Sequence, residues 1–242
     1  MAKKFILVDA NVVAAYYLPR SLKNKAALEY IDNIFEFIRQ NPNDYMIYIP
    51  NFCIAEVVSV FIKHTFAKWN VKETINTKVY NSLINSFQND IHNAQFMYHL
   101  ELDRYHVLGI NLVAPIDHYF QISRTSKEKR RYNPAGTFDQ LIISMGVQLA
   151  KIHGRENVCI LTADYRLAKI VEKCRSNIRA TTLEKMKISI AEKVCSVKFS
   201  KELFPNYINL GRKKILENEI TDFFGSFPLK VKRKKSVYKW LN

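Results

Sequence analysis

The chain has 242 residues, enough for one large folded domain, and its 48% hydrophobic and 12% aromatic content exclude an intrinsically disordered protein. Its 37 Lys and Arg outnumber its 22 Asp and Glu, and the formal net charge of +15 indicates an anionic partner such as nucleic acid. No apolar stretch reaches the roughly 18 residues that a membrane span needs, so we expect no contact with a membrane.

Short apolar runs alternate with longer amphipathic stretches in the first half of the chain. Residues 4–8 form a short apolar run typical of a buried parallel strand. Pro50 and Asn51 follow a second run of this kind and mark the start of a long helix. The expected elements are strands at 4–8 and 46–49 and helices at 11–18, 24–40 and 51–69.

The second half of the chain continues this alternation. We expect Pro115 to interrupt one helix and Thr137 to cap the next. The expected elements are helices at 72–95, 103–122, 137–154 and 165–173 and strands at 95–102, 157–161 and 194–199, with some helical spacing over 208–224. This order of elements predicts an α/β fold with a largely parallel sheet.

Four acidic residues stand where apolar segments meet polar sites, namely Asp9, Glu56, Asp139 and Asp164. Asp9 and Asp164 follow predicted strands, and Glu56 lies in the helix after another strand. Because ligand sites in such folds gather at the carboxyl ends of the strands, we expect these side chains to converge. Four carboxylates together would repel one another unless a divalent cation, which prefers oxygen ligands, neutralised them. The pattern predicts a metal-dependent phosphodiesterase site.

Each of these acidic residues also has a purely structural interpretation. Asp9 and Asp164 precede predicted helices, where an aspartate serves as an N-cap. Asp139 lies near a helix N-terminus, where it could simply interact with the helix dipole. Glu56 is the hardest to explain in this way, because no Lys or Arg stands four residues before or after it.

Other polar residues are interpreted as structural. His92, His99 and His106 recur every seven residues, but the predicted helix breaks between them, so we do not expect them to bind a metal. Asp117 and His118 follow a proline and are interpreted as surface residues.

Four widely spaced cysteines, Cys53, Cys159, Cys174 and Cys195, form no zinc-binding motif. We interpret them as reduced thiols, and Cys53 and Cys159 as small buried residues. Asp9 and Asn11 interrupt the N-terminal apolar run, so we expect no cleaved signal peptide and a cytoplasmic protein.

The motifs Ile6-Leu7-Val8-Asp9-Ala10-Asn11, Ala55-Glu56-Val57, Thr137-Phe138-Asp139 and Leu161-Thr162-Ala163-Asp164 together resemble those of the PIN-domain nuclease family. The resemblance covers residues 4 to about 173, or to 199 at most. It implies a three-layer α/β/α sandwich and an endoribonuclease that depends on Mg²⁺ or Mn²⁺. It also implies that Asp9, Glu56, Asp139 and Asp164 bind the metal and act in catalysis, with Asn11 and Thr162 as supporting polar residues. Members of the family often form homodimers, and some are toxins restrained by an antitoxin, so both kinds of partner are expected candidates.

Two basic segments are candidates for nucleic-acid binding. The first lies before Asp139 and the second near the C-terminus; the residues are Arg124, Lys127, Lys129, Arg130, Arg131, Lys232, Arg233, Lys234 and Lys235. We expect residues 1–199 to form the PIN-like domain, with the first basic segment as an insertion, and residues 200–242 to form a basic extension.

Two classes of function follow from the sequence. The first is a metal-dependent ribonuclease, and DNA stays open as a substrate because phosphate contacts do not distinguish the sugars. The second is a non-catalytic nucleic-acid-binding or scaffold protein with the same fold. The complete set of acidic residues favours the ribonuclease, since a scaffold has no need for mutually repelling carboxylates.

Overall fold

The computed structural model describes residues 2–19, 25–66, 75–92, 96–122, 134–211 and 217–225. The two basic segments that contain Arg124, Lys127, Lys129, Arg130, Arg131, Lys232, Arg233, Lys234 and Lys235 lie outside these residues. None of the described helices is both long enough and apolar enough to span a membrane.

A parallel sheet of five strands forms the centre of the described structure, in the order β3-β2-β1-β4-β5. The strands are β1 (Lys4–Val8), β2 (Tyr45–Pro50), β3 (Met97–Leu100), β4 (Val158–Thr162) and β5 (Asn206–Asn209). The central strand β1 pairs with β2 on one side and β4 on the other, and Val8 lies opposite Leu161. The apolar run expected at 4–8 is thus the middle of the sheet, which explains why Ile6, Leu7 and Val8 are fully buried.

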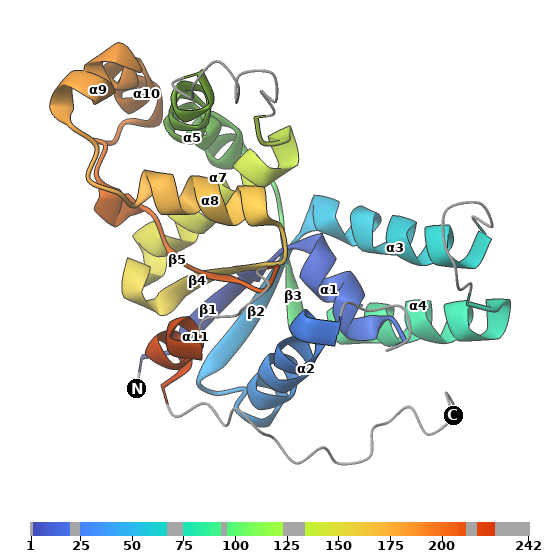
Figure 1. Cartoon of the computed structure of the whole chain (residues 1–242). Coiled ribbons are helices and arrows are strands. Elements are labelled where there is room, and N and C mark those ends of the chain that lie inside the picture. The colour runs from blue at the N-terminus through green and yellow to red at the C-terminus, as the bar shows by residue number, and fades with distance from the viewer. Residues whose placement is uncertain are drawn as a thin grey trace.

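Helices flank this sheet, and Figure 1 shows how they surround it. They are α1 (Ala10–Tyr17), α2 (Lys25–Gln40), α3 (Asn51–Phe66), α4 (Thr77–His92), α5 (Arg104–Ile122), α7 (Thr137–His153), α8 (Tyr165–Cys174), α9 (Ala180–Lys185), α10 (Ile188–Cys195) and α11 (Glu217–Phe224). Two short 3₁₀ turns add Arg155–Asn157 and Lys201–Leu203. The expected α/β fold with a parallel sheet is confirmed, and it agrees with a three-layer α/β/α sandwich.

The prediction that Pro115 interrupts a helix is wrong, because α5 runs through it without a break. A proline inside a helix removes one hydrogen bond to the carbonyl four residues earlier. That carbonyl belongs to Asn111, which is exposed, so water can replace the missing donor. The helix therefore tolerates the proline at a position on its solvent side.

The end of the sheet also differs from expectation. Residues 188–195 form α10, so the strand expected at 194–199 is wrong, and β5 at 206–209 takes its place beside β4. The alternating apolar residues of 194–199 resembled a strand, but Lys187 and Ser196 adopt left-handed conformations that begin and end the helix. The sheet consequently continues past residue 199, the boundary expected between the domain and the extension.

The segment that follows β5 packs against the sheet. The Tyr45 hydroxyl at the start of β2 donates a hydrogen bond of 2.9 Å to the carbonyl of Phe224 in α11, and Lys4 of β1 donates to the carbonyl of Phe223. Phe223 and Phe224 are themselves buried. Phe223 and Phe224 thus belong to the same hydrophobic core as β1 and β2.

The interpretation of Asp117 as a surface residue is wrong, because only 3% of it is exposed. Its Oδ2 accepts a hydrogen bond of 2.8 Å from the backbone N–H of Ala135. Ala135 lies just before α7, the helix that begins at Thr137 and carries Asp139. The buried carboxylate therefore fixes the chain at the entrance to that helix.

Candidate metal centre

The four predicted acidic residues converge at the carboxyl end of the sheet. Asp9 follows β1 directly, and Asp164 stands two residues after β4, the neighbour of β1. Glu56 lies in α3, which begins where β2 ends on the other side of β1. Asp139 is the third residue of α7. The ends of two adjacent strands and the first turns of two helices thus supply the four carboxylates.

Asp9 is the most deeply placed of the four, with only 4% of its surface exposed. Its Oδ2 accepts hydrogen bonds from the Thr162 hydroxyl at 2.8 Å and from the Asn11 side-chain amide at 3.4 Å. Asp9 occupies the N-cap position of α1 but makes no side-chain capping bond, so the interpretation of Asp9 as a mere cap is wrong. Among the described residues none donates to its Oδ1, which leaves that oxygen for a ligand.

Burial determines the proton affinity of Asp9. Its pKa rises from 3.8 to about 6, chiefly through desolvation. The charges of Asp164 and Glu56 add to this rise, and the hydrogen bonds from Thr162 and Asn11 act against it. A carboxylate with so high a pKa is an unfavourable charge in the absence of a cation. A bound divalent cation would remove this cost directly.

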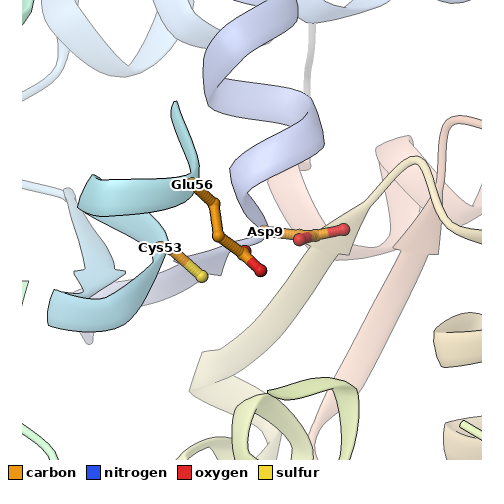
Figure 2. A group of neighbouring side chains, drawn as sticks. All are labelled: Asp9, Cys53 and Glu56. Atoms are coloured by element: carbon orange, nitrogen blue, oxygen red, sulfur yellow. The ribbon is translucent and has the colours of Figure 1, made fainter. Parts of the chain in front are cut away.

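Glu56 extends from α3 toward Asp9, with Cys53 one turn earlier on the same helix (Figure 2). One ligand atom from each of these residues lies within 4.8 Å of the other two. Burial raises the pKa of Glu56, and the charge of Asp139 raises it as well. The thiol of Cys53 donates a hydrogen bond to the Glu56 carboxylate, which lowers the pKa of Glu56.

Asp139 shares this electrostatic environment although it is not part of that compact group. Burial and the charge of Asp164 raise its pKa to about 6, while the backbone N–H of Gly136 and the charge of Arg166 act in the opposite direction. The Gly136 N–H donates to Oδ2 at 3.1 Å, and Gly136 is the N-cap of α7. The expectation that Thr137 caps this helix is therefore wrong by one residue.

Asp164 also has a structural role, at the start of α8. Its Oδ1 accepts a hydrogen bond of 2.6 Å from the N–H of Arg166 and so caps α8. Its own N–H donates to the Thr162 hydroxyl at 2.9 Å. The capping interpretation is correct for Asp164, yet its charge still reaches the site, because it raises the pKa of both Asp9 and Asp139.

Thr162 connects the carboxyl ends of β1 and β4. It is fully buried, and its single hydroxyl donates to Asp9 and accepts from the backbone of Asp164. A hydroxyl can do both at once, whereas a methyl group can do neither. Thr162 therefore fixes the orientation of the Asp9 carboxylate relative to the loop that carries Asp164.

The donor set fits a hard divalent cation. Carboxylate oxygens are the ligands that Mg²⁺ and Mn²⁺ prefer, and the site offers several of them close together. Cys53 is the one soft atom in the compact group, but burial and the charges of Asp9 and Glu56 raise the pKa of its thiol, so it stays protonated and acts as a donor to Glu56. The residues therefore fit a hard divalent cation better than a metal that requires a thiolate.

Sequence reasoning treated Cys53 as a small buried residue and missed its place in this site. The signal was its position three residues before Glu56, which puts both side chains on one face of a helix. The predicted break between the three histidines is confirmed, because His92 lies in α4, His99 in β3 and His106 in α5. In the described part of the chain the metal-binding group contains no histidine.

The fold and the site define a parallel α/β protein with an acidic centre at the carboxyl end of its sheet. No protein-family model matches the chain, and no curated protein matches its sequence. A solved structure that resembles it is VapBC2 from Rickettsia felis bound to a DNA fragment from their promoter, with a TM-score of 0.40 and 13% sequence identity. The match covers 69% of this chain and 92% of that one.

Proposed function

We propose that the protein is a metal-dependent endoribonuclease that hydrolyses phosphodiester bonds of RNA at Asp9, Glu56, Asp139 and Asp164. The observation that carries this proposal is the convergence of these acidic residues, whose burial and mutual repulsion raise the pKa of Asp9 and Asp139 to about 6. Such an arrangement is costly unless it serves a cation. The net charge of +15 on the same chain supports a polyanionic substrate.

In this proposal the residues have distinct roles. Asp9 and Glu56 would hold the Mg²⁺ or Mn²⁺ ion, with Asp139 and Asp164 completing the negative environment. When bound, such an ion supplies an activated water and neutralises charge on the phosphate. Thr162 and Asn11 hold the Asp9 carboxylate in place, and Cys53 holds that of Glu56. Arg166, whose charge lowers the pKa of Asp139, is placed to attract the phosphate backbone.

Cleavage of a mixed RNA pool with Mn²⁺ tests the proposal. We expect the wild-type protein to cut the pool and the double variant Asp9→Asn, Asp139→Asn to lose this activity. Glu172→Gln is the matched control, because Glu172 is an exposed acid of α8 outside the metal centre. Equal cutting by the wild type and the double variant would show that the activity belongs to another site or to a contaminant.

A non-catalytic nucleic-acid-binding or scaffold protein is the second candidate. The observation in its favour is the role of Asp164 as the N-cap of α8, since it accounts for one of the four carboxylates without a metal. Thermal unfolding at millimolar Mg²⁺ or Mn²⁺ separates the two. A cation that binds the native state raises the melting temperature, and the absence of any rise would favour the scaffold.

Partners and compartment are part of the same proposal. The family resemblance suggests an antitoxin or another regulatory protein as partner and a homodimer as the assembly. The four free cysteines favour the cytoplasm. Sedimentation of the protein alone tests the dimer. Copurification with the products of neighbouring genes would identify a regulator. RNA cleavage should then be lost when the regulator is added and recovered when it is removed.

A further inference from the structure

Two phenylalanine rings stack at the border of the metal centre. Phe52 is the second residue of α3 and Phe138 the second residue of α7. Their ring centroids are 5.1 Å apart and their planes differ by 17°, so the rings lie nearly parallel. Two helices that are far apart in the sequence thus bring one ring of each together.

The pair is fixed on one side and open on the other. Phe52 is partly buried and packs against the hydrophobic core. Phe138 lies on it and is 50% exposed. Since Phe52 covers one face of the Phe138 ring, the exposed half includes the other face. The stack therefore presents a flat apolar surface to solvent on a rigid support.

This surface adjoins the carboxylates. Phe138 directly precedes Asp139, and Phe52 stands one helical turn before Glu56 and next to Cys53. A phosphate bound at the carboxylates through a cation would bring its own nucleotide to this border. Aromatic rings bind unpaired bases by stacking on their flat faces.

Another exposed phenylalanine shows what an ordinary surface ring looks like in this protein. Phe66 ends the same helix α3 and is 59% exposed. It contacts Tyr80 edge-on, at 5.7 Å and 67°, and lies about four turns from Cys53 along the helix. Among the described residues it has neither a parallel stacking partner nor the carboxylates of the metal centre beside it, so exposure alone does not distinguish Phe138.

We propose that the Phe52–Phe138 stack binds an unpaired base of the nucleic-acid strand whose phosphate lies at the metal centre, so that the protein selects single-stranded segments. The inference rests on the proposed function, because it takes the carboxylates as the site of the phosphate. A base held in a duplex is stacked on its neighbours and cannot lie flat on Phe138. The stack therefore acts as a specificity element and takes no part in the chemistry.

Binding of a short single-stranded RNA that carries a fluorescent adenine analogue tests this inference without relying on cleavage. The analogue loses fluorescence when it stacks on an aromatic ring. The unaltered metal centre in Ca²⁺ buffer serves as the common background, because Ca²⁺ takes the same oxygen ligands but, with its looser geometry, should leave the strand uncut under the proposed function. We expect quenching in this background for at least one position of the analogue.

Three substitutions in that background resolve the role of the stack. We expect Phe138→Leu to abolish the quenching and weaken single-strand binding by roughly fivefold or more, as the loss of one base stack predicts. Phe138→Trp should retain both the quenching and the single-strand binding. Phe66→Leu is the matched control and should change neither. Binding of a blunt duplex of the same sequence should be the same for Phe138→Leu as for its parent.

The outcomes separate this inference from the proposed function. The deciding comparison is Phe138→Leu against Phe66→Leu, and equal effects of these two substitutions on quenching and binding overturn the inference. Absence of quenching at every position of the analogue also overturns it. Quenching that depends on Phe138 in a protein whose wild type cuts no RNA would instead overturn the nuclease and leave the stacking site in place.

Discussion

At the scale of single residues, the site depends on hydrogen bonds that orient charged groups. Thr162 is the central example, because one buried hydroxyl serves both Asp9 and the backbone of Asp164. Cys53 plays a similar part for Glu56. Such supporting groups affect metal affinity as strongly as many direct ligands do.

Thr162→Val tests the role of this hydroxyl. The substitution keeps the shape but leaves the Asp9 Oδ2 without its 2.8 Å donor and the N–H of Asp164 without its acceptor. We expect Mn²⁺ affinity to fall by about tenfold or more and the free energy of unfolding to fall by about 1–3 kcal/mol. Titration calorimetry and urea unfolding measure the two effects. Thr162→Ser, which keeps the hydroxyl, should stay close to wild type; equal losses in both variants would contradict the assignment.

The raised pKa values predict how pH affects the protein without metal. Asp9 has a pKa of about 6 in the folded state against 3.8 ordinarily, so the folded chain holds this proton more tightly than the unfolded chain. The resulting stabilisation is complete below pH 3.8 and is lost as the pH rises through about 6. Asp139 contributes in the same direction.

We therefore expect the metal-free protein to lose stability from this source between about pH 4 and 7, and Asp9→Asn to lose less. At pH 8 the uncharged amide that replaces the carboxylate in Asp9→Asn should make the metal-free protein more stable by about 1–3 kcal/mol. Urea unfolding in a chelator across this pH range measures both. If the free energy of unfolding fell more steeply with pH in Asp9→Asn than in the wild type, the raised pKa of Asp9 would be contradicted.

At the scale of elements, close packing between helices positions the acidic residues. Gly109 of α5 faces Ser144 of α7, and a Cβ added at Gly109 would overlap the Ser144 hydroxyl. That hydroxyl donates a hydrogen bond of 2.6 Å to the carbonyl of His106. The helix that carries Asp139 is thus held against α5 at a contact with no spare room.

Gly109→Ala should push these helices apart. We expect a loss of about 1–3 kcal/mol in the free energy of unfolding, although alanine is the better helix former, because overpacking outweighs propensity here. The double variant Gly109→Ala, Ser144→Ala removes the overlapping hydroxyl and should recover part of the loss. Chemical denaturation measures both variants, and strictly additive effects would rule out the contact as the cause.

The elements also show what sequence alone could and could not predict. The strands at 4–8 and 46–49 and the helix over 51–66 were predictable because their apolar periodicity is strong and local. The strand at 206–209 was missed because its four residues, Asn206–Asn209, show little apolar character and gain their place by pairing with β4. Pro115 misled for the opposite reason: its local signal is strong, but the carbonyl that loses its hydrogen bond belongs to the exposed Asn111, so the helix continues.

The same distinction applies to the candidate site. Each acidic residue was identifiable from its apolar neighbours, and their convergence followed from parallel strands. The hydrogen bonds from Thr162 to Asp9 and from Cys53 to Glu56 depend on side-chain orientation, which periodicity does not determine. The burial of Asp117 was missed for this reason too, because its partner Ala135 is 18 residues away.

At the scale of the whole molecule, the segment after residue 199 is joined to the core. Ile208 and Leu210 lie in and just after β5, and Ile220, Phe223 and Phe224 of α11 are buried like them. Each fully buried side chain of this kind contributes about 1.5–3 kcal/mol, and together they are comparable to the net stability of most domains.

A chain that ends at residue 199 should consequently fail to fold cooperatively, whereas one that ends at residue 225 should unfold cooperatively near the temperature of the full chain. Circular dichroism during heating compares the two. A cooperative transition in the shorter chain would show that β5 and α11 are accessory to the domain and would support the boundary expected at residue 199.

The hydrogen bond between Thr162 and Asp9 spans 153 positions of the chain, and Glu56 joins the same cluster from a third segment. No local fragment can reproduce this arrangement, so the candidate cation site forms only together with the whole sheet. A bound ion would then be a reporter of global folding: local fraying would leave it in place, and it would be released in one step with complete unfolding. Metal release and loss of secondary structure should therefore share a single transition.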